Sequence, residues 1–424
     1  MMGARKRTKL GDLIETQKGY AFKSGWYCDK GRPIVKVSDF TRDSVESSNL
    51  VCIPETIAAD FLKYELNTDD VVVQTVGSWP SNPASVVGKC VRIPNNIAGA
   101  LLNQNAVKLS PQDGLDQRFL FYLLRSEDFK AYIIGTAQGA ASQAAITLEA
   151  IRGYEFERPP LPIQRRIASI LGVYDDLIEV NRRRIALLEK MAWRLFEEWF
   201  VHFRFPGHEG HTMIKSPNGL IPKGWRYARL DEVADVNNDT IGAANVPAQI
   251  YYVDISSVSR GEVQKFELMN FSDAPGRARR RVQDGSVIWS TVRPNRRSYA
   301  LIHNPSQDLV VSTGFAVLDA REVSAAYLYH YTTTDVFVGY LVGNATGSAY
   351  PAVTGAAFER AAILVPDSDV DGRFNSIAEP ILRLITTMQT QNTQLAASRE
   401  FLLPRLISGD LSVSATECGF EAVA

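Results

Sequence analysis

The residues with the clearest chemical potential are basic side chains gathered between positions 260 and 300. This segment holds nine basic and four acidic residues, although the 424-residue chain has a formal net charge of only −1. Its basic members are Arg260, Lys265, Arg277, Arg279, Arg280, Arg281, Arg293, Arg296 and Arg297. Guanidinium groups contact phosphates and pair bidentately with guanine. The segment therefore predicts a nucleic-acid contact, with a solvated run of surface charge as the alternative.

The loop at positions 293–299 is the most distinctive part of this basic segment. It follows the strand-like run 287–291 and adds an amide and a ring to its arginines, and asparagine can pair with adenine in the major groove. The loop that follows an earlier strand-like run, at 76–83, contains no arginine. We expect DNA contacts from Arg277, Arg279, Arg280, Arg281, Arg293, Asn295, Arg296, Arg297, Tyr299, Ser348 and Tyr350, and weaker polar ones from Lys36, Gln74, Ser78, Trp79, Asn82, Gln138 and Gln143.

Motifs for enzyme chemistry are missing from the sequence. It has no glycine-rich phosphate loop, no GxSxG and no HExxH. A DNA methyltransferase needs a motif of the Asn-Pro-Pro-Tyr type, whereas this chain has only Arg-Pro-Pro-Leu at 158–161. The cysteines lack zinc-ligand spacing, and His202, His208 and His211 lie in a segment typical of a polar linker. We therefore expect no catalytic residues, no metal and no cofactor bound by this chain.

Composition is that of a folded protein. Hydrophobic residues make up 45% and charged residues 22%, and the length suits two domains of ordinary size. The basic N-terminus leads into no apolar run, which argues against a signal peptide. The sequence also lacks an uninterrupted apolar stretch of about 18 residues, so we expect no membrane span. These features predict a cytoplasmic protein with free thiols.

An internal repeat organises the chain. The segment 144–151 with the prolines at 159–160 parallels 351–358 with the proline at 366, at one constant offset. Upstream, 9–13 resembles 229–233, and the strand-like runs 33–37 and 71–75 resemble 250–254 and 287–291. A loop rich in Gly, Ala and Ser, at 135–143 and 343–350, completes each copy and permits close backbone approach. The repeat therefore predicts that the chain contains two copies of one structural unit.

Each copy ends in a long amphipathic helix. From 163 to about 200 the chain has no proline, and apolar residues alternate at spacings of three and four, as in a coiled coil. The predicted core comprises Ile167, Leu171, Tyr174, Ile178, Asn181, Leu188 and Leu195, and in the second copy Phe374, Ile381, Ile385, Met388, Asn392, Leu395 and Leu402. Each stripe needs a partner, and we expect the two helices, the first of which is roughly 55 Å long, to pair antiparallel. An ordinary helix-bundle core is the alternative.

The sequence resembles the specificity subunit of type I restriction-modification systems over nearly its whole length. The most specific portions are 159–168, 177–182, 195–200 and 402–411. The second helix departs from the family pattern, because 366–372 replaces the usual proline-rich, glutamine-containing start.

The resemblance implies two mixed α/β target-recognition domains, at 1–158 and 206–366, and helical spacers at 159–205 and 367–424. It further implies a bipartite, asymmetric double-stranded DNA target. Partners would be two methyltransferase subunits that use S-adenosylmethionine, and restriction subunits that use ATP and Mg²⁺; no membrane is involved. Two other functions stay open: an enzyme with diverged motifs, and a scaffold whose domains bind protein.

Overall fold

The computed structural model describes residues 6–47, 49–80, 86–140, 143–242, 245–348 and 350–413. The chain divides into two compact units. Unit 1 contains the residues up to Ile178 and those from Gln394 onward, and unit 2 is Glu179–Thr393. Two long helices, α5 (Leu161–Phe196) and α10 (Ser368–Ser408), contribute to both units. Each unit therefore combines an α/β domain with one part of each long helix.

The domain of unit 1 is built on a four-stranded antiparallel sheet. Its strands are β1 (Lys6–Lys9), β2 (Ile14–Lys18), β3 (Arg32–Val35), β4 (Cys52–Ile53), β5 (Val71–Gln74), β6 (Val76–Gly77), β7 (Cys90–Arg92), β8 (Leu101–Leu102), β9 (Ala106–Pro111), β10 (Ala144–Ala145) and β11 (Glu155–Arg158). The main sheet has the order β2-β9-β5-β7, and β3 lies between β4 and β8 in a second sheet. The helices are α1 (Glu55–Ala58), α2 (Gln117–Leu123), α3 (Glu127–Gly135) and α4 (Leu148–Gly153).

The domain of unit 2 repeats this topology. Its strands are β12 (Met213–Ser216), β13 (Gly219–Pro222), β14 (Arg226–Arg229), β15 (Ala234–Val236), β16 (Gln249–Val253), β17 (Val258–Ser259), β18 (Glu262–Val263), β19 (Glu267–Asn270), β20 (Ala278–Arg281), β21 (Val287–Ser290), β22 (Tyr299–Leu301), β23 (Leu309–Ser312), β24 (Phe315–Ala320) and β25 (Ala362–Val365). The main sheet has the order β15-β24-β21-β22. The helices are α6 (Leu230–Val233), α7 (Ala325–Thr332), α8 (Asp335–Gly343) and α9 (Gly355–Glu359).

Matched strand pairings relate the two domains. The order β2-β9-β5-β7 corresponds element by element to β15-β24-β21-β22. The parallel pair β3 and β8 corresponds to β16 and β23, and the antiparallel pair β1 and β11 corresponds to β14 and β25. The strand-like runs that were matched in the sequence thus occupy equivalent places, and the predicted fold of mixed α/β domains with two packed long helices is confirmed.

The repeated sequence around Thr147 and Thr354 marks the start of a short helix in each domain. Thr147 is the N-cap of α4, and its hydroxyl accepts a hydrogen bond from the backbone N–H of Ala150 at 3.0 Å. Thr354 occupies the same N-cap position before α9. Of the two threonines, Thr147 alone makes the side-chain cap hydrogen bond, so the repeat preserves the residue and its place at the helix start rather than the bond itself.

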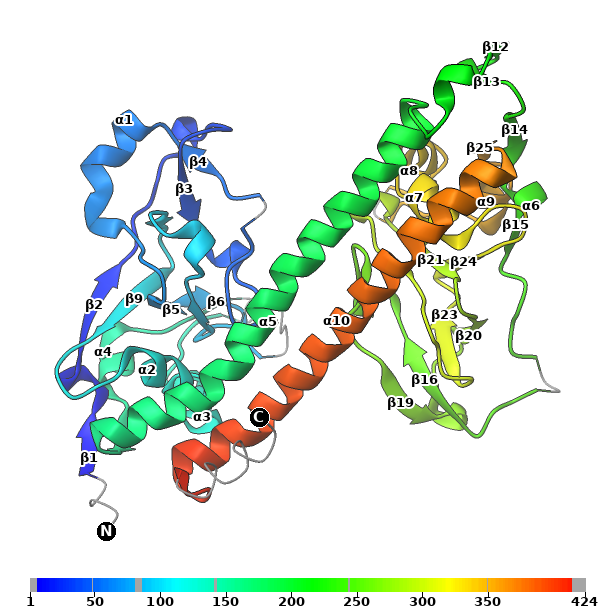
Figure 1. The fold of residues 1–424 in the computed structure, drawn as a ribbon. Coiled ribbons are helices and arrows are strands. Elements are labelled where there is room, and N and C mark those ends of the chain that lie inside the picture. Colours follow the sequence, from blue (N-terminus) through cyan, green and yellow to red (C-terminus); the bar gives the residue numbers. More distant parts are fainter. Residues whose placement is uncertain are drawn as a thin grey trace. The chain divides into compact units, whose positions relative to one another are not determined.

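The long helices run antiparallel where they meet in each unit. In unit 2, Phe196 near the end of α5 packs on Phe374 near the start of α10, with ring centroids 6.1 Å apart. Further along the same pair, the Asn181 side-chain amide donates to the Asn392 side-chain oxygen at 3.1 Å. In unit 1, the start of α5 shares a core with Leu403 and Leu406 of α10. Figure 1 shows both helices, α5 in green and α10 in orange and red.

Burial along the predicted helix core is graded rather than uniform. Ile167, Leu171, Ile178, Asn181, Phe374 and Ile385 are buried, whereas Tyr174, Leu188, Leu195, Ile381, Met388, Asn392, Leu395 and Leu402 are half-buried. The deepest burial lies where a domain also covers the helix, as at Ile167 and Phe374, both 0% exposed. Residues of the domains thus complete the packing around the predicted core positions of the two long helices.

The unusual start of α10 fulfils the same structural role as the start of α5. Gln164, fully buried, accepts from the backbone N–H of Asp116 at 2.9 Å and donates to the carbonyls of Gly114 and Pro159. Asp371 holds the equivalent position in the second copy and accepts from both the backbone N–H and the hydroxyl of Ser324, each at 2.6 Å. Asp116 and Ser324 are the N-caps of α2 and α7. The aspartate therefore replaces the glutamine as the link between long helix and domain.

Candidate nucleic-acid interface

Two loops lie side by side at one end of the main sheet of unit 2. The arginine-rich loop follows β21, and the Gly/Ala/Ser-rich loop follows α8. An antiparallel bridge joins Val292 to Ala352, and the backbone N–H of Arg293 donates to the carbonyl of Pro351 at 2.7 Å. The Arg293 guanidinium lies over the ring of Tyr350, 4.3 Å from its centroid. The structure thus unites two segments that the sequence analysis treated separately.

The same two loops meet in unit 1. Strand β6, directly after β5, pairs with β10, and the Trp79 indole N–H donates to the carbonyl of Ala140 at 2.9 Å. Gly139 has a φ of +149°, and a Cβ there would lie 2.1 Å from the carbonyl oxygen of Gln143. A glycine is required at that position because the loop folds back tightly on itself.

Five predicted contact residues of unit 2 are exposed to solvent. Arg277, Asn295 and Arg296 are exposed, and among the described residues neither arginine side chain has an ion-pair or hydrogen-bond partner. Ser348 and Tyr350 are exposed as well, with Tyr350 at 68%. A guanidinium without an internal partner keeps its full capacity to bind an external anion.

Other predicted contact residues of unit 2 have internal roles. Arg280 is half-buried and donates to the Asn237 side chain and to the carbonyl of Phe315, and burial lowers the pKa of its guanidinium. Arg279 stacks on Phe271, Arg281 donates to the carbonyl of Asn245, and Arg297 pairs with Asp335. The Tyr299 ring is buried and its hydroxyl accepts from Arg260 Nε at 3.1 Å. Sequence alone could not separate these side chains from the exposed ones.

A hollow of about 710 Å³ lies beside the arginine-rich loop. Arg277, Arg293, Arg296 and Tyr350 line one part of it, which joins the exposed arginines to a concave surface. The remaining lining includes Tyr252, Asp254, Ser256 and Ser312, which the sequence analysis did not single out. These residues lie in or just after β16 and at the end of β23, which are parallel neighbours in the second four-stranded sheet of unit 2, and that strand order was the signal that could have indicated them.

The predicted residues of unit 1 are distributed differently. Gln138 and Gln143 are exposed in the Gly/Ala/Ser-rich loop, and the Lys36 ammonium lies 4.5 Å from the centroid of the Tyr27 ring. Gln74 is fully buried and donates to the carbonyl of Val76 at 2.9 Å, and Ser78 is also buried. Asn82 lies outside the described residues. Gln74 and Ser78 therefore support the loop from within rather than presenting a polar group at its surface.

A second basic hollow, of about 540 Å³, lies in unit 1 and was not predicted. Arg42, Lys89, Arg125 and Lys130 line it together with Glu400. The Lys89 ammonium donates to the carbonyl of Phe40 at 3.1 Å, and burial lowers its pKa. These lysines and arginines are scattered in the sequence, which is why no charge run revealed them.

No group of three His, Cys, Asp or Glu side chains in the described part of the chain is arranged to hold a metal ion. The His208 and His211 rings instead pack against Phe205, with centroids 6.3 and 4.9 Å away. No described helix is long and apolar enough to span a bilayer.

Comparison with known proteins agrees with this architecture. Residues 5–190 match the model of the type I restriction modification DNA specificity domain. The chain is 23% identical over 320 residues to the MjaIX specificity subunit of Methanocaldococcus jannaschii, covering 73% of each, and 21% identical over 141 residues to the HindI specificity subunit of Haemophilus influenzae, covering 32% of this chain and 31% of the relative. In fold it resembles the type I S subunit from M. genitalium, with a TM-score of 0.57, 13% identity and 96% coverage of both chains.

The chain is thus similar to the specificity subunits of type I restriction-modification systems, a family that is non-catalytic, and residues 5–190 match its DNA specificity domain. Within such a system it is the subunit that confers DNA specificity. The predicted family and the predicted absence of enzyme activity are both confirmed by these matches.

Proposed function

We propose that the chain reads a bipartite, asymmetric duplex DNA target, one half-site with each α/β domain. The observation that carries this proposal is the pair of adjoining loops at one sheet end of each domain, built on the same scaffold but with different side chains. Two domains that recognise different DNA sequences can share one fold, provided that the side chains that contact the base edges differ between them.

The domain of unit 2 reads its half-site through the arginine-rich loop. Arg277 and Arg296 supply phosphate or guanine contacts, Asn295 supplies an amide for a base edge, and Arg293 is oriented by Tyr350. Arg280 and Arg297 hold the loop and its neighbouring strands in place through their internal partners. Recognition by this domain therefore rests on few arginines and is salt-dependent.

The domain of unit 1 reads its half-site with fewer charges. Gln138 and Gln143 are exposed amides of its Gly/Ala/Ser-rich loop, and amides pair bidentately with adenine. Lys36, held over Tyr27, contributes a single cation. We include Asn82 and Trp79 in this surface because both belong to the loop that follows β5 and β6.

Partner subunits carry out the chemistry. We propose that two methyltransferase subunits, using S-adenosylmethionine, dock on the long helices, and that restriction subunits using ATP and Mg²⁺ join them, all acting on DNA in the cytoplasm. Exposed apolar side chains on α5 support docking: in unit 2, Val180, Leu187 and Met191 are 41%, 62% and 58% exposed and share one helix face at spacings of seven and four. Such a stripe is typical of a surface covered by a partner.

Replacing Arg296 by alanine in the complex with its methyltransferase partners tests the proposal. Loss of a bidentate base contact costs roughly 1–3 kcal/mol, so binding to duplexes that carry the target should weaken about 5- to 150-fold. Arg296→Lys should restore part of the affinity if the contact is to phosphate, and little if it is to guanine.

Arg226→Ala is the matched control, because Arg226 is an exposed arginine of the same domain that pairs with Glu322 away from the hollow. Binding should stay within about twofold of the unaltered complex, since a surface ion pair contributes little. Equal effects of the two substitutions, or unchanged binding by Arg296→Ala, would remove the loop from the interface. Salt-independent association would favour a protein-binding scaffold instead.

A further inference from the structure

The two long helices are alike in burial but not in chemistry. When the copies are aligned at the constant offset of the repeat, most buried positions of one helix correspond to a buried position of the other. The equivalent pairs with this property include Ile167 and Phe374, Leu171 and Ala378, Ile178 and Ile385, and Phe196 and Leu403.

All of these pairs are apolar in both copies. Of the other buried pairs, Gln164 and Asp371 are polar in both copies, and two combine a charged residue with an apolar one. Asp175 corresponds to Leu382, and Arg399 corresponds to Ala192. Each helix therefore carries one buried charge where the other helix has an apolar side chain.

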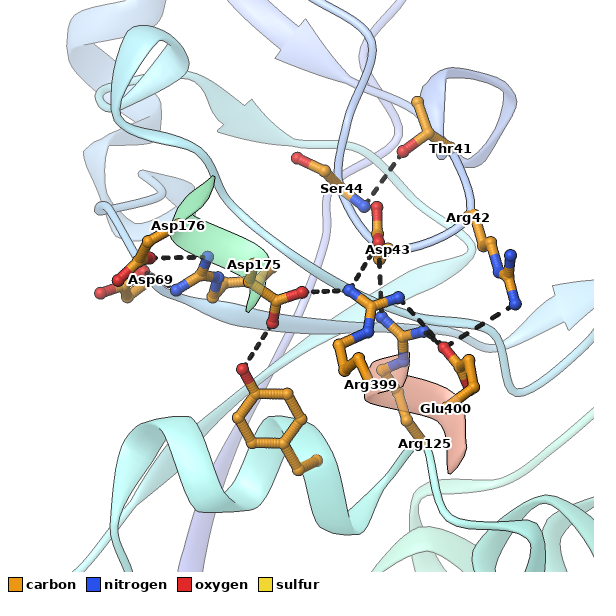
Figure 2. Close-up of polar contacts among 12 residues, drawn as sticks. Thr41, Arg42, Asp43, Ser44, Asp69, Arg125, Asp175, Asp176, Arg399 and Glu400 are labelled. Atoms are coloured by element: carbon orange, nitrogen blue, oxygen red, sulfur yellow. Dashed lines mark hydrogen bonds and ion pairs between the residues drawn. The ribbon is translucent and has the colours of Figure 1, made fainter. Parts of the chain in front are cut away.

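In unit 1, these two charged residues meet in one buried cluster (Figure 2). The Arg399 side chain is 1% exposed and pairs with Asp175 of α5, with Asp43 at 2.9 Å and with Glu400 at 3.0 Å. Asp43 belongs to the loop after β3, so Arg399 joins the last part of α10 to both α5 and the first domain.

Two residues of the first domain complete this cluster. The Tyr122 hydroxyl donates to Asp175 at 2.5 Å, and Arg125 pairs with Glu400 at 2.6 Å. Tyr122 lies in α2, and Arg125 lies between α2 and α3. All carboxylates of the cluster therefore have a cationic or hydroxyl partner, as buried charges require.

Equivalent positions in the two domains can be identified from their helix caps. The N-caps of α3 and α8 are Ser126 and Thr334. Tyr122 and His330 precede these caps by the same spacing, so His330 is the counterpart of Tyr122 in unit 2.

Unit 2 has an apolar and aromatic site at these equivalent positions. The His330 ring stacks on Phe196, with centroids 5.5 Å apart, and Phe374 packs against it edge-on. Leu382 and Ala192 hold the positions equivalent to Asp175 and Arg399. No carboxylate therefore occupies the counterpart positions of Tyr122 or Asp175.

We propose that the charge cluster around Arg399 makes pairing of the two copies obligately heterotypic. The helix α10 of the second copy is accepted only against the first copy's helix and domain, because only they present Asp175 and Asp43 to Arg399. The surface formed by α5, α2 and the loop after β3 is thus an interaction surface whose partner is the second copy's helix. This inference is independent of what the domains bind.

The alternative pairings would each leave charge buried without its partner. If two second copies paired through their helices, each Arg399 would face Leu382 and His330 in place of Asp175 and Tyr122. If two first copies paired, each Asp175 would face Ala192 and keep only the Tyr122 hydroxyl. Removing one member of a buried ion pair is strongly unfavourable, so the heterotypic pair should be preferred by at least about 100-fold.

Cutting the whole folded protein between the copies tests this inference. A protease site is inserted between Gly207 and His208, where a Cβ on Gly207 would meet nothing within 4 Å. Isotope-labelled and unlabelled cut proteins are mixed, and native mass spectrometry follows the exchange of halves. The unaltered protein should exchange into heterotypic pairs, with homotypic pairs near or below about 1%.

The variant D175N/R399M removes both charges at nearly constant volume. We expect it to keep its helical circular dichroism and to raise the homotypic share at least about 10-fold. D175L/R399A, which transfers the residues of unit 2 into unit 1, serves if the first variant does not fold. An unchanged homotypic share in a folded variant, or homotypic pairs above about one tenth with the unaltered protein, would overturn the inference.

Discussion

Arg399→Ala should destabilise unit 1, and the size of the effect depends on which partners the buried carboxylates keep once the guanidinium is gone. Asp175 and Asp43 are each 8% exposed, and both lose the guanidinium that they share. Breaking a buried pair in this way typically costs about 3–5 kcal/mol. Asp175 keeps the Tyr122 hydroxyl, and Arg125 lies 3.8 Å from Asp43, so part of the lost compensation persists. We therefore expect the lower end, a decrease of about 3 kcal/mol in the free energy of unfolding.

Urea unfolding at pH 7, followed by circular dichroism, measures this decrease, and hydrogen exchange in α2 and α3 assigns it to unit 1. The neutral variant D175N/R399M is the control and should lose about 1 kcal/mol or less, because it removes the charge of Asp175 together with that of Arg399, so that of the two aspartates only Asp43 loses an ionic partner. A loss below about 1 kcal/mol for Arg399→Ala would refute the reasoning. So would equal losses for the single and the double variant.

Three further predictions concern other contacts. Gln164→Ala should lower the free energy of unfolding of unit 1 by about 2 kcal/mol, since the Asp116 N–H and the Gly114 carbonyl lose their partner; urea unfolding checks this. Burial lowers the pKa of His330 to about 4, so the folded chain stays neutral there while the unfolded chain binds a proton, and stability should fall by about 3 kcal/mol from pH 7 to pH 4. His330→Phe should abolish that part of the pH dependence in thermal unfolding. Tyr350→Leu should weaken DNA binding by less than Arg296→Ala does in the same binding assay, because it removes the ring beneath the Arg293 guanidinium but no positive charge.

The architecture was predictable because its signals are local. The apolar stripe of each long helix and the threonine caps at Thr147 and Thr354 recur at one offset, and each is set by residues close in sequence. The domain boundaries and the DNA-contact residues stay predictions. The sequence places Asn181 and Asn392 at core positions of the two helices. It does not predict that they contact one another, because that contact depends on how two helices far apart in the sequence meet.

Side-chain roles at the surface were less predictable for the same reason. Arg280 and Arg296 belong to the same basic segment, yet Asn237 and the Phe315 carbonyl bind Arg280 internally while Arg296 stays exposed. Arg399 falls at an apolar position of the helix pattern, and its carboxylate partner Asp43 lies 356 residues away. Sequence spacing carries no information on contacts of this range.

The most direct test of the account is the map of methylated bases in cells that express this subunit with the proposed methyltransferase subunits. Two unlike short sequences separated by a fixed number of unspecified bases are expected, and Arg296→Ala should relax recognition of one of them only. A single continuous or palindromic methylated sequence, or a pattern that does not depend on this chain, would contradict reading by two different domains.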